Sequence, residues 1–184
     1  LADELGRDPV DVRLQNASRR AFTSPTDLKL PPFRPFLDRA VRELGYRKRA
    51  REGGVGFSAF VLIPGTEPGE SARIVVKDRR LQVWVGGHVQ GQGHEVFVRK
   101  LIQEELNVPP ELVDVEKGDT DMLERGIGSW GSRSAMVIGA AVVKASRKIH
   151  AKVVKKHGRY SVDALLAGTY DEYVFHDHKE PVNS

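Results

Sequence analysis

Apolar residues recur every three or four positions in several stretches of the chain, which is the spacing of one buried helix face. Asp8 followed by Pro9 is typical of a helix start, and Gly45 is placed to end a helix in a left-handed cap. Asn107 has the same position after a later apolar stripe. These signals predict helices at about residues 9–16, 36–44, 98–106 and 132–156.

After the second of these helices the pattern changes to alternation, the period of a half-buried strand. A first candidate strand covers residues 55–63. Residues 72–77 and 81–85, joined by a turn, predict an antiparallel hairpin, and a short strand is expected at 113–115. Because strands and a long helix follow each other twice, we expect an α+β fold in which a hairpin-containing sheet packs with two long helices.

The pattern divides the chain into three regions. Residues 1–52 would form an N-terminal helical segment and connector, whose basic run at 47–51 lies on a solvated surface. Residues 53–157 would form the α+β domain. The remaining residues, 158–184, are polar, and we expect an irregular surface tail in which the alternating histidines 176 and 178 are only a weak metal-binding pattern.

Composition narrows the kind of protein. The 184 residues, 40% of them apolar, suffice for a folded core. The absence of cysteine excludes disulfides, cysteine nucleophiles, and zinc or iron–sulfur sites held by cysteine. No apolar run approaches the roughly 20 residues that span a bilayer, so we expect no membrane span and a cytoplasmic location. The net charge of +4 is a small excess of 29 basic over 25 acidic side chains, which is weak evidence for a polyanionic partner.

Two unusual loops precede the two long helices. The first runs from Gly86 to His94, and its four glycines let the backbone approach a ligand closely, while two glutamine amides can bond the edge of a heterocycle. The second runs from Gly126 to Ser134 and places three hydroxyls and a guanidinium at a helix N-terminus, where unpaired N–H groups favour anions. Together the loops predict one polar, anionic ligand clamped between them, such as a nucleotide or a pterin phosphate.

Simpler interpretations exist for each loop. The first could be a mobile linker, and the second an ordinary serine N-cap. The spacing of Gly126, Gly128 and Gly131 also matches GxGxxG, but a dinucleotide-binding turn must follow a strand directly, and residues 122–125 do not have a strand pattern. With no Walker A pattern either, we expect no ATP site.

Four motifs in the chain resemble the molybdopterin-binding part of the xanthine dehydrogenase and aldehyde oxidase family, particularly its carbon monoxide dehydrogenase large subunits. They are Gln90-Gly91-Gln92-Gly93-His94-Glu95, Gly118-Asp119-Thr120-Asp121, Gly128-Ser129-Trp130-Gly131-Ser132-Arg133-Ser134 and Gly139-Ala140-Ala141. Segments 5–16 and 68–72 are also similar to the family, and the order and approximate spacing agree over residues 1–151.

The resemblance implies cofactor-binding roles for residues of both loops. Those on the pterin and its dithiolene would be Gln90, Gly91, Gln92, Gly93 and His94, and those at the pterin and phosphate end would be Ser129, Ser132, Arg133 and Ser134. The implied cofactor is molybdopterin, with its cytosine dinucleotide form left open. Since the dithiolene of the cofactor binds molybdenum in this family, no residue of this chain is expected to ligate a metal.

The resemblance also implies that the chain works within a larger enzyme. Members of the family oxidise a small substrate, such as carbon monoxide, an aldehyde or an N-heterocycle, with a glutamate base in a Gly-Val-Gly-Glu-like motif. This chain has no such motif, and neither Glu70 nor Glu95 matches it, so no catalytic residue is assigned. We therefore expect other chains of the large subunit, and iron–sulfur and flavin subunits, as partners.

Two other functions stay open. A split or orphan fragment could fold without cofactor and act only as a structural or interaction module, because cofactor sites need walls that one piece need not supply. A nucleic-acid-binding module is disfavoured, because the basic residues of the last helix lack interleaved aromatic residues. Those basic residues are Lys144, Arg147, Lys148, Lys152, Lys155 and Lys156.

Overall fold

The computed structural model describes residues 1–25 and 27–179, and the chain divides into two compact units, Leu1–Leu62 and Ile63–Ser184. Each unit has its own buried apolar cluster. The described part contains helices and two separate sheets, so the α+β prediction is confirmed. No helix within it is long and apolar enough to cross a membrane. Likewise, the described residues include no group of three or more His, Asp or Glu side chains that could hold a metal ion.

Unit 1 is a small helical unit. Its elements are α1 (Pro9–Asn16), β1 (Phe22–Thr23), β2 (Lys29–Leu30), α2 (Phe33–Glu43) and α3 (Tyr46–Glu52). The Asp8 carboxylate accepts a hydrogen bond from Val10 N at 2.7 Å, which confirms the predicted cap of α1. Gly45, with φ +60°, lies between α2 and α3, so the basic run at 47–51 is exposed as expected but helical. The core of this unit comprises Val10, Leu14, Leu37, Val41 and Tyr46.

The predicted strand at 55–63 is wrong. No helix or strand is assigned between residues 54 and 68. Phe57 and Ala59 pack against the core of unit 1, whereas Phe60 is 73% exposed. The alternating pattern therefore describes an extended segment that partly packs by its side chains, because a strand also requires a neighbouring backbone, which an alternating pattern alone does not supply.

Unit 2 is a four-stranded sheet covered by helices, with strand order β5-β4-β3-β6. The strands are β3 (Gly69–Lys77), β4 (Arg80–Val85), β5 (Val113–Lys117) and β6 (Tyr170–Asp177). β3 pairs antiparallel with β4 and with β6, while β4 pairs parallel with β5. The predicted hairpin is thus confirmed as β3 and β4, and the short strand at 113–115 as the start of β5.

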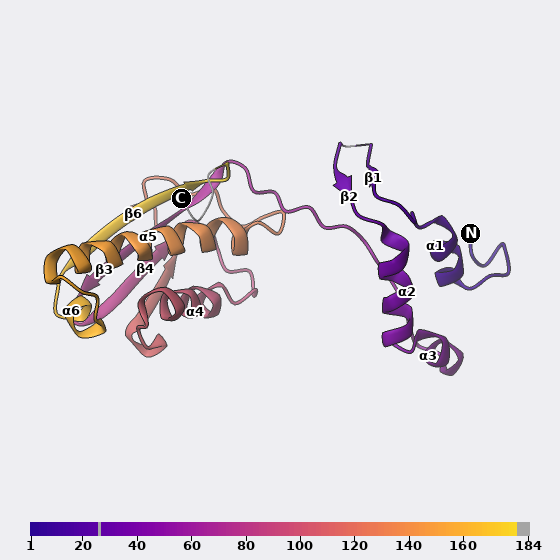
Figure 1. Ribbon diagram of the computed structural model, residues 1–184, viewed down its shortest axis with the longest axis horizontal. Coiled ribbons are helices and arrows are strands. Elements are labelled where there is room, and N and C mark those ends of the chain that lie inside the picture. The colour runs from indigo at the N-terminus through magenta and orange to yellow at the C-terminus, as the bar shows by residue number, and fades with distance from the viewer. Residues whose placement is uncertain (26, 180–184) are drawn as a thin grey trace. The chain divides into compact units, whose positions relative to one another are not determined.

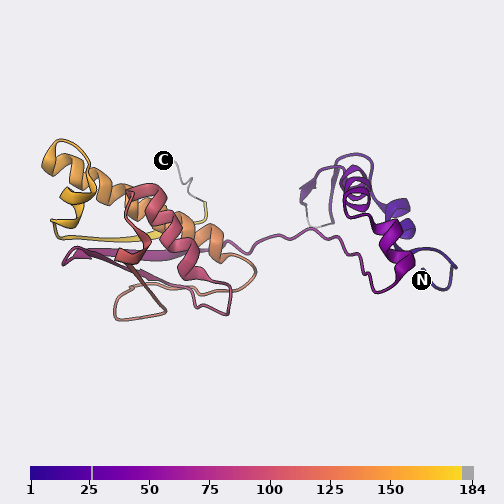
Figure 2. The same ribbon diagram turned by 90° about the horizontal axis from the view of Figure 1, so that it is seen from below.

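The helices of unit 2 lie on one side of this sheet (Figure 1, Figure 2). They are α4 (His94–Leu106), the 3₁₀ turn η1 (Pro110–Leu112), α5 (Ser134–His157) and α6 (Val162–Leu166). Both long helices were predicted, and Asn107 ends α4 with φ +52° as expected. Ile102 of α4, Ile149 of α5 and Ile74 of β3 are fully buried in the same core, so helices and sheet share one apolar layer.

The expected irregular tail at 158–184 is wrong for its described part. α6 and β6 both lie there, and β6 pairs with β3 along eight residues, from Gly69 opposite Asp177 to Val76 opposite Tyr170. Tyr170 and Val174 are buried, but Asp171 and Glu172 between them are charged: Asp171 pairs with Arg73 of β3, and Glu172 pairs with Lys148 of α5. Those charges gave the segment its polar composition. Residues 180–184 of the predicted tail lie outside the described residues.

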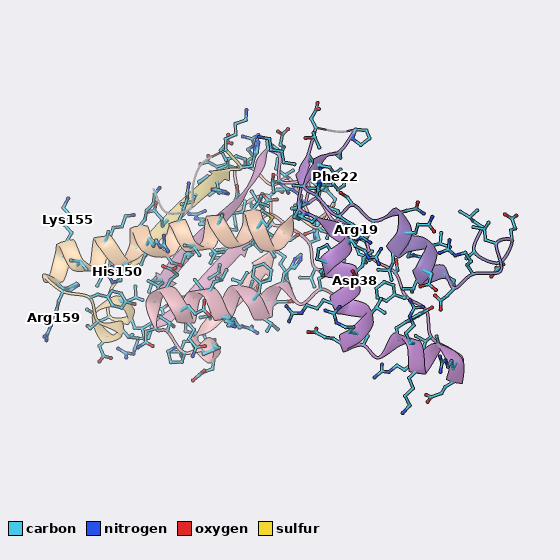
Figure 3. All side chains as sticks on the ribbon, turned by 45° about the vertical axis from the view of Figure 1, so that its right-hand side comes forward. Arg19, Phe22, Asp38, His150, Lys155 and Arg159 are labelled. Carbon is cyan, nitrogen blue, oxygen red and sulfur yellow. The ribbon has the colours of Figure 1, made fainter. Side chains whose placement is uncertain are left out.

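The basic residues of α5 divide into two groups. Arg147 donates to Glu105 of α4 at 2.9 Å, and Lys148 and Lys152 both contact Glu172 of β6. Farther along, Lys155 near the C-terminal end of α5 and Arg159 just after the helix extend outward (Figure 3). Three of the basic side chains of α5 therefore form ion pairs with α4 and β6 within unit 2.

Candidate functional site

The first loop, Gly86–Gly93, joins β4 to α4 and comes very close to the second loop. A side-chain Cβ at Gly87 would lie 2.6 Å from Ser129 Oγ, and one at Gly86 would lie 2.1 Å from Glu70 Oε1. Only glycine fits such approaches. Gly93 begins α4 with φ +68°, a conformation that also favours glycine. The glycines of this loop thus bring it against the rest of the site and turn the chain into α4.

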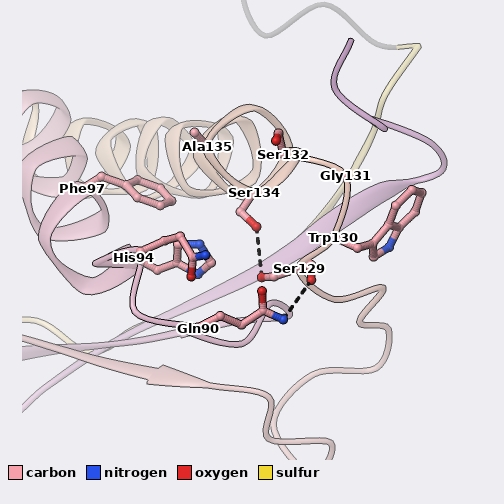
Figure 4. Close-up of a pocket in the computed structure, with 10 residues that line it drawn as sticks. Gln90, His94, Phe97, Ser129, Trp130, Gly131, Ser132, Ser134 and Ala135 are labelled. Carbon is pink, nitrogen blue, oxygen red and sulfur yellow. Dashed lines mark hydrogen bonds between the residues drawn. The ribbon is translucent and has the colours of Figure 1, made fainter. Parts of the chain in front are cut away.

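The second loop leads into the N-terminus of α5; one hydrogen bond joins it to the first loop and another ties its own residues together (Figure 4). Gln90 Nε2 donates to the backbone oxygen of Ser129 at 3.3 Å. Ser134 Oγ donates to Ser129 Oγ at 2.9 Å. The two loops, about forty residues apart in the sequence, therefore meet in space, as the sequence pattern required for a single ligand.

The loops enclose a pocket of about 350 Å³ (Figure 4), within the usual size range of small-molecule sites. Both loops and the first turns of α4 and α5 line it. The lining residues are Gln90, Gln92, His94, Phe97, Ser129, Trp130, Gly131, Ser132, Ser134 and Ala135. Six of the nine residues expected to bind a cofactor are among them. Gly91, Gly93 and Arg133 are not.

Unused hydrogen-bonding groups gather at this pocket. His94 is 5% exposed, and its Nδ1 has no partner in the part of the chain that the structure describes. At the N-terminus of α5, no hydrogen bond among the described residues uses the backbone N–H of Ser134 or Ala135. A buried polar atom without a partner is costly, so the Nδ1 of His94 indicates a site that a polar ligand completes, and the first-turn N–H groups of α5 lie beside it at the same pocket.

Arg133 has a different place from the one expected. It is fully buried, directly before α5, and each of its three guanidinium nitrogens donates to a carbonyl oxygen or to Glu70. Its guanidinium lies 5.2 Å from the ring centre of Trp130. Arg133 thus supports the pocket wall from behind. The position of Glu70 in this arrangement could not be inferred from its sequence context.

Four lining residues are outside the nine that were expected to bind a cofactor: Phe97, Trp130, Gly131 and Ala135. Phe97 follows His94 by one helical turn, and their rings meet edge to face with centroids 5.6 Å apart. Trp130 lies in the second loop and is 53% exposed. The i, i+3 spacing after His94 is the signal that could have identified Phe97.

Other candidate residues lie apart from this pocket. Gly118, Asp119 and Thr120 line a separate cavity of about 240 Å³ together with His88. Glu95 pairs with Lys117, whose hydrogen bond lowers the pKa of the Glu95 carboxyl below its ordinary value. A carboxylate held in this charged form by a lysine is suited to structure rather than to proton transfer.

Comparison with known proteins gives a consistent result. The model of a family described as the molybdopterin cofactor-binding domain matches residues 37–180. The chain is 48% identical over 71 residues to the carbon monoxide dehydrogenase large chain of Hydrogenophaga pseudoflava, covering 39% of this chain and 9% of that protein. It is 32% identical over 145 residues to the 6-hydroxypseudooxynicotine dehydrogenase complex subunit gamma of Paenarthrobacter nicotinovorans, covering 78% of this chain and 17% of that protein.

Solved structures show the same fold. A reconstituted CO dehydrogenase from Oligotropha carboxidovorans superposes with a TM-score of 0.71 at 22% identity, covering 97% of this chain and 31% of that chain. The aldehyde oxidoreductase from Desulfovibrio gigas gives a TM-score of 0.68 at 23% identity, covering 95% and 22%. This chain therefore spans less than a third of the chains that it matches.

Proposed function

Since this chain belongs to the molybdopterin cofactor-binding domain family found in the large subunits of molybdenum hydroxylases, we propose that the pocket between its two glycine-rich loops holds the pterin and its phosphate. The observation that carries the proposal is the group of unused donors and acceptors there. The Nδ1 of His94 and the N–H groups of Ser134 and Ala135, which have no partner among the described residues, are polar atoms of the kind that would bind a pterin and its phosphate.

Each proposed contact follows from the chemistry of the side chain. The amides of Gln90 and Gln92 can both donate to and accept from the heterocycle edge. The hydroxyls of Ser129, Ser132 and Ser134 lie with the helix N-terminus and would bind the phosphate end. Gly91 and Gly93 would act through their backbone, and Arg133 by holding the second loop.

The bound cofactor would supply the molybdenum centre at which the substrate is oxidised. This chain would bind the cofactor, orient it and shield one side from water, and no residue here is assigned as general base. The cytosine dinucleotide form is part of the proposal. Release of a cytidine nucleotide from the denatured protein tests it, and release of the pterin alone would indicate the shorter form.

We propose further that the chain acts within a multi-chain oxidoreductase. Because it spans 9% to 17% of the curated relatives named above, the remaining walls of the site would come from other large-subunit segments. Iron–sulfur and flavin subunits would carry the electrons. The names of the relatives favour a small carbon substrate, such as carbon monoxide, an aldehyde or an N-heterocycle.

Replacing Gln92 by alanine tests the assignment. The complex containing this chain is purified from its source cells, and its molybdenum and pterin contents are measured by metal analysis and pterin fluorescence. Loss of the Gln92 amide hydrogen bonds should reduce cofactor retention about tenfold. Gln103→Ala is the matched control, because Gln103 is an exposed glutamine of α4 outside the pocket.

Two outcomes would contradict the proposal. A wild-type complex without molybdenum and pterin would favour the alternative, a module that folds without cofactor. Equal retention in the Gln92→Ala and Gln103→Ala variants would mean that the cofactor lies elsewhere.

A further inference from the structure

A buried ion pair lies behind the pocket, between Glu70 at the start of β3 and Arg133 directly before α5. Both side chains are fully buried, and Arg133 Nη1 lies 3.2 Å from Glu70 Oε2. Breaking such a pair is costly, because it leaves an uncompensated charge away from water. Replacing both charges by apolar residues of similar volume is often neutral or stabilising, so burial alone does not account for the pair, and its hydrogen bonds indicate what it does.

Every partner of the Glu70 carboxylate is a donor. Oε1 accepts from Ser71 N at 2.9 Å and from Ile127 N at 3.1 Å. Oε2 accepts from Gly128 N at 2.9 Å, besides the guanidinium of Arg133. Glutamine would have to direct its own NH₂ group at one of these donors. The position thus requires a charged carboxylate, which acts as a built-in anion for the amides of the second loop.

Arg133 fastens the other side of the same loop. Its Nη1 donates to Gly128 O at 2.7 Å, and its Nε donates to Gly65 O at 2.8 Å. Gly128 is therefore held through both of its backbone polar groups: its N–H donates to Glu70 and its carbonyl oxygen accepts from Arg133. The next residue in the chain is Ser129, which lines the pocket.

The first loop depends on the same pair. Gly86 passes so close to Glu70 that a Cβ there would lie 2.1 Å from Oε1, and Gly86 N donates to Ser71 O at 3.2 Å. Glu70 thus packs against the start of the first loop and binds backbone N–H groups near the start of the second. Since the two charges of the pair compensate each other, the attraction for a bound anion is left to the free amides of α5.

We propose that Glu70 and Arg133 are positioning residues of the pocket, which hold Gly128 so that Ser129 and the α5 N-terminus face the ligand. This rests on the proposed function for the identity of the ligand, but the loop geometry is independent of it. Residues that orient the ligands of a bound metal typically change metal affinity or activity roughly 10- to 100-fold when they are replaced, and we expect an effect of the same order here.

Glu70→Ala tests the proposal in the purified complex, by hydrogen exchange of peptides covering residues 126–134 and by pterin content. Exchange in these peptides should accelerate about tenfold, while β3 and β4 peptides keep their protection. Pterin content should fall at least as much. Added acetate can replace the lost carboxylate, and it should restore both the slow exchange and the pterin content.

The Arg133→Lys variant keeps the positive charge but loses the forked N–H donors of the guanidinium. It should show the same faster exchange in residues 126–134, and added acetate should not reverse it.

Val153→Ala is the matched control, because Val153 is fully buried near the far end of α5 and its loss destabilises unit 2 without contacting the pocket. If Glu70→Ala and Val153→Ala lose pterin equally, or if exchange rises throughout unit 2 and acetate changes nothing, the positioning role is overturned. A wild-type complex that lacks pterin while Glu70→Ala still loosens residues 126–134 would refute the proposed function and leave the loop-positioning role standing.

Discussion

The imidazole of His94 is buried against Phe97, and its Nδ1 has no partner among the described residues. His94→Phe removes this unsatisfied atom and keeps an aromatic ring of similar size. The cofactor-free protein should therefore be as stable as the wild type or up to about 1 kcal/mol more stable. Pterin retention should fall about tenfold, because a ligand contact is lost. Thermal unfolding and pterin fluorescence measure the two effects, and lower stability with unchanged pterin would contradict the assignment.

At the same scale, the local residue pattern predicted much of the pocket. Glycines, glutamines and serines before two helices are visible in the sequence, and the structure brings six of the nine selected residues to one cavity. The buried position of the Arg133 side chain could not be predicted, because it depends on a contact with Glu70, 63 residues earlier in the chain. The residues next to a helix start show which polar side chains lie there, but they do not show which charged residue, distant in the sequence, pairs with them.

Among the elements, the two long helices and the hairpin were predicted correctly, whereas the equally regular alternation at 55–63 does not form a strand in the part of the chain that the structure describes. α4, α5 and the hairpin of β3 and β4 each bury residues at the period of their own structure. β6 was missed because its buried Tyr170 and Val174 are separated by charged residues, which contact the neighbouring elements. Strand pairing across one hundred residues, such as Arg73 of β3 opposite Tyr173 of β6, cannot be recognised from the residues of either strand alone.

Glu172 links strand β6 to helix α5 and gives a prediction about pH. Burial raises the pKa of its carboxyl, but hydrogen bonds from Lys152 and Lys148 outweigh this effect and lower the pKa below its ordinary value. A lowered folded-state pKa means that the stabilisation is present above the unfolded value of about 4.3 and is lost as pH falls through the folded one. Glu172→Gln should therefore cost about 1 kcal/mol at pH 7, with the difference disappearing in acid.

Denaturant unfolding of both proteins at several pH values measures this difference. Asp163→Asn is the control, because the Asp163 side chain is 94% exposed and its contact with Arg79 spans 3.6 Å. That variant should unfold like the wild type at every pH. A Glu172→Gln penalty that stays constant down to acidic pH would mean that lost packing, rather than charge, accounts for it.

At the scale of the whole molecule, the two units have separate cores, and the segment between them offers a direct test. Phe60 and Leu62 are 73% and 61% exposed in a stretch without helix or strand, whereas Phe36 is 57% exposed within α2. Proteases need a locally extended backbone, so chymotrypsin should cut first after Phe60 or Leu62 and spare Phe36.

Mass spectrometry identifies the fragments. Circular dichroism should show that the larger fragment keeps its secondary structure, because its apolar cluster contains no residue before Ala72. Early cleavage at Phe36 or within α4 or α5 would contradict two independently folded units.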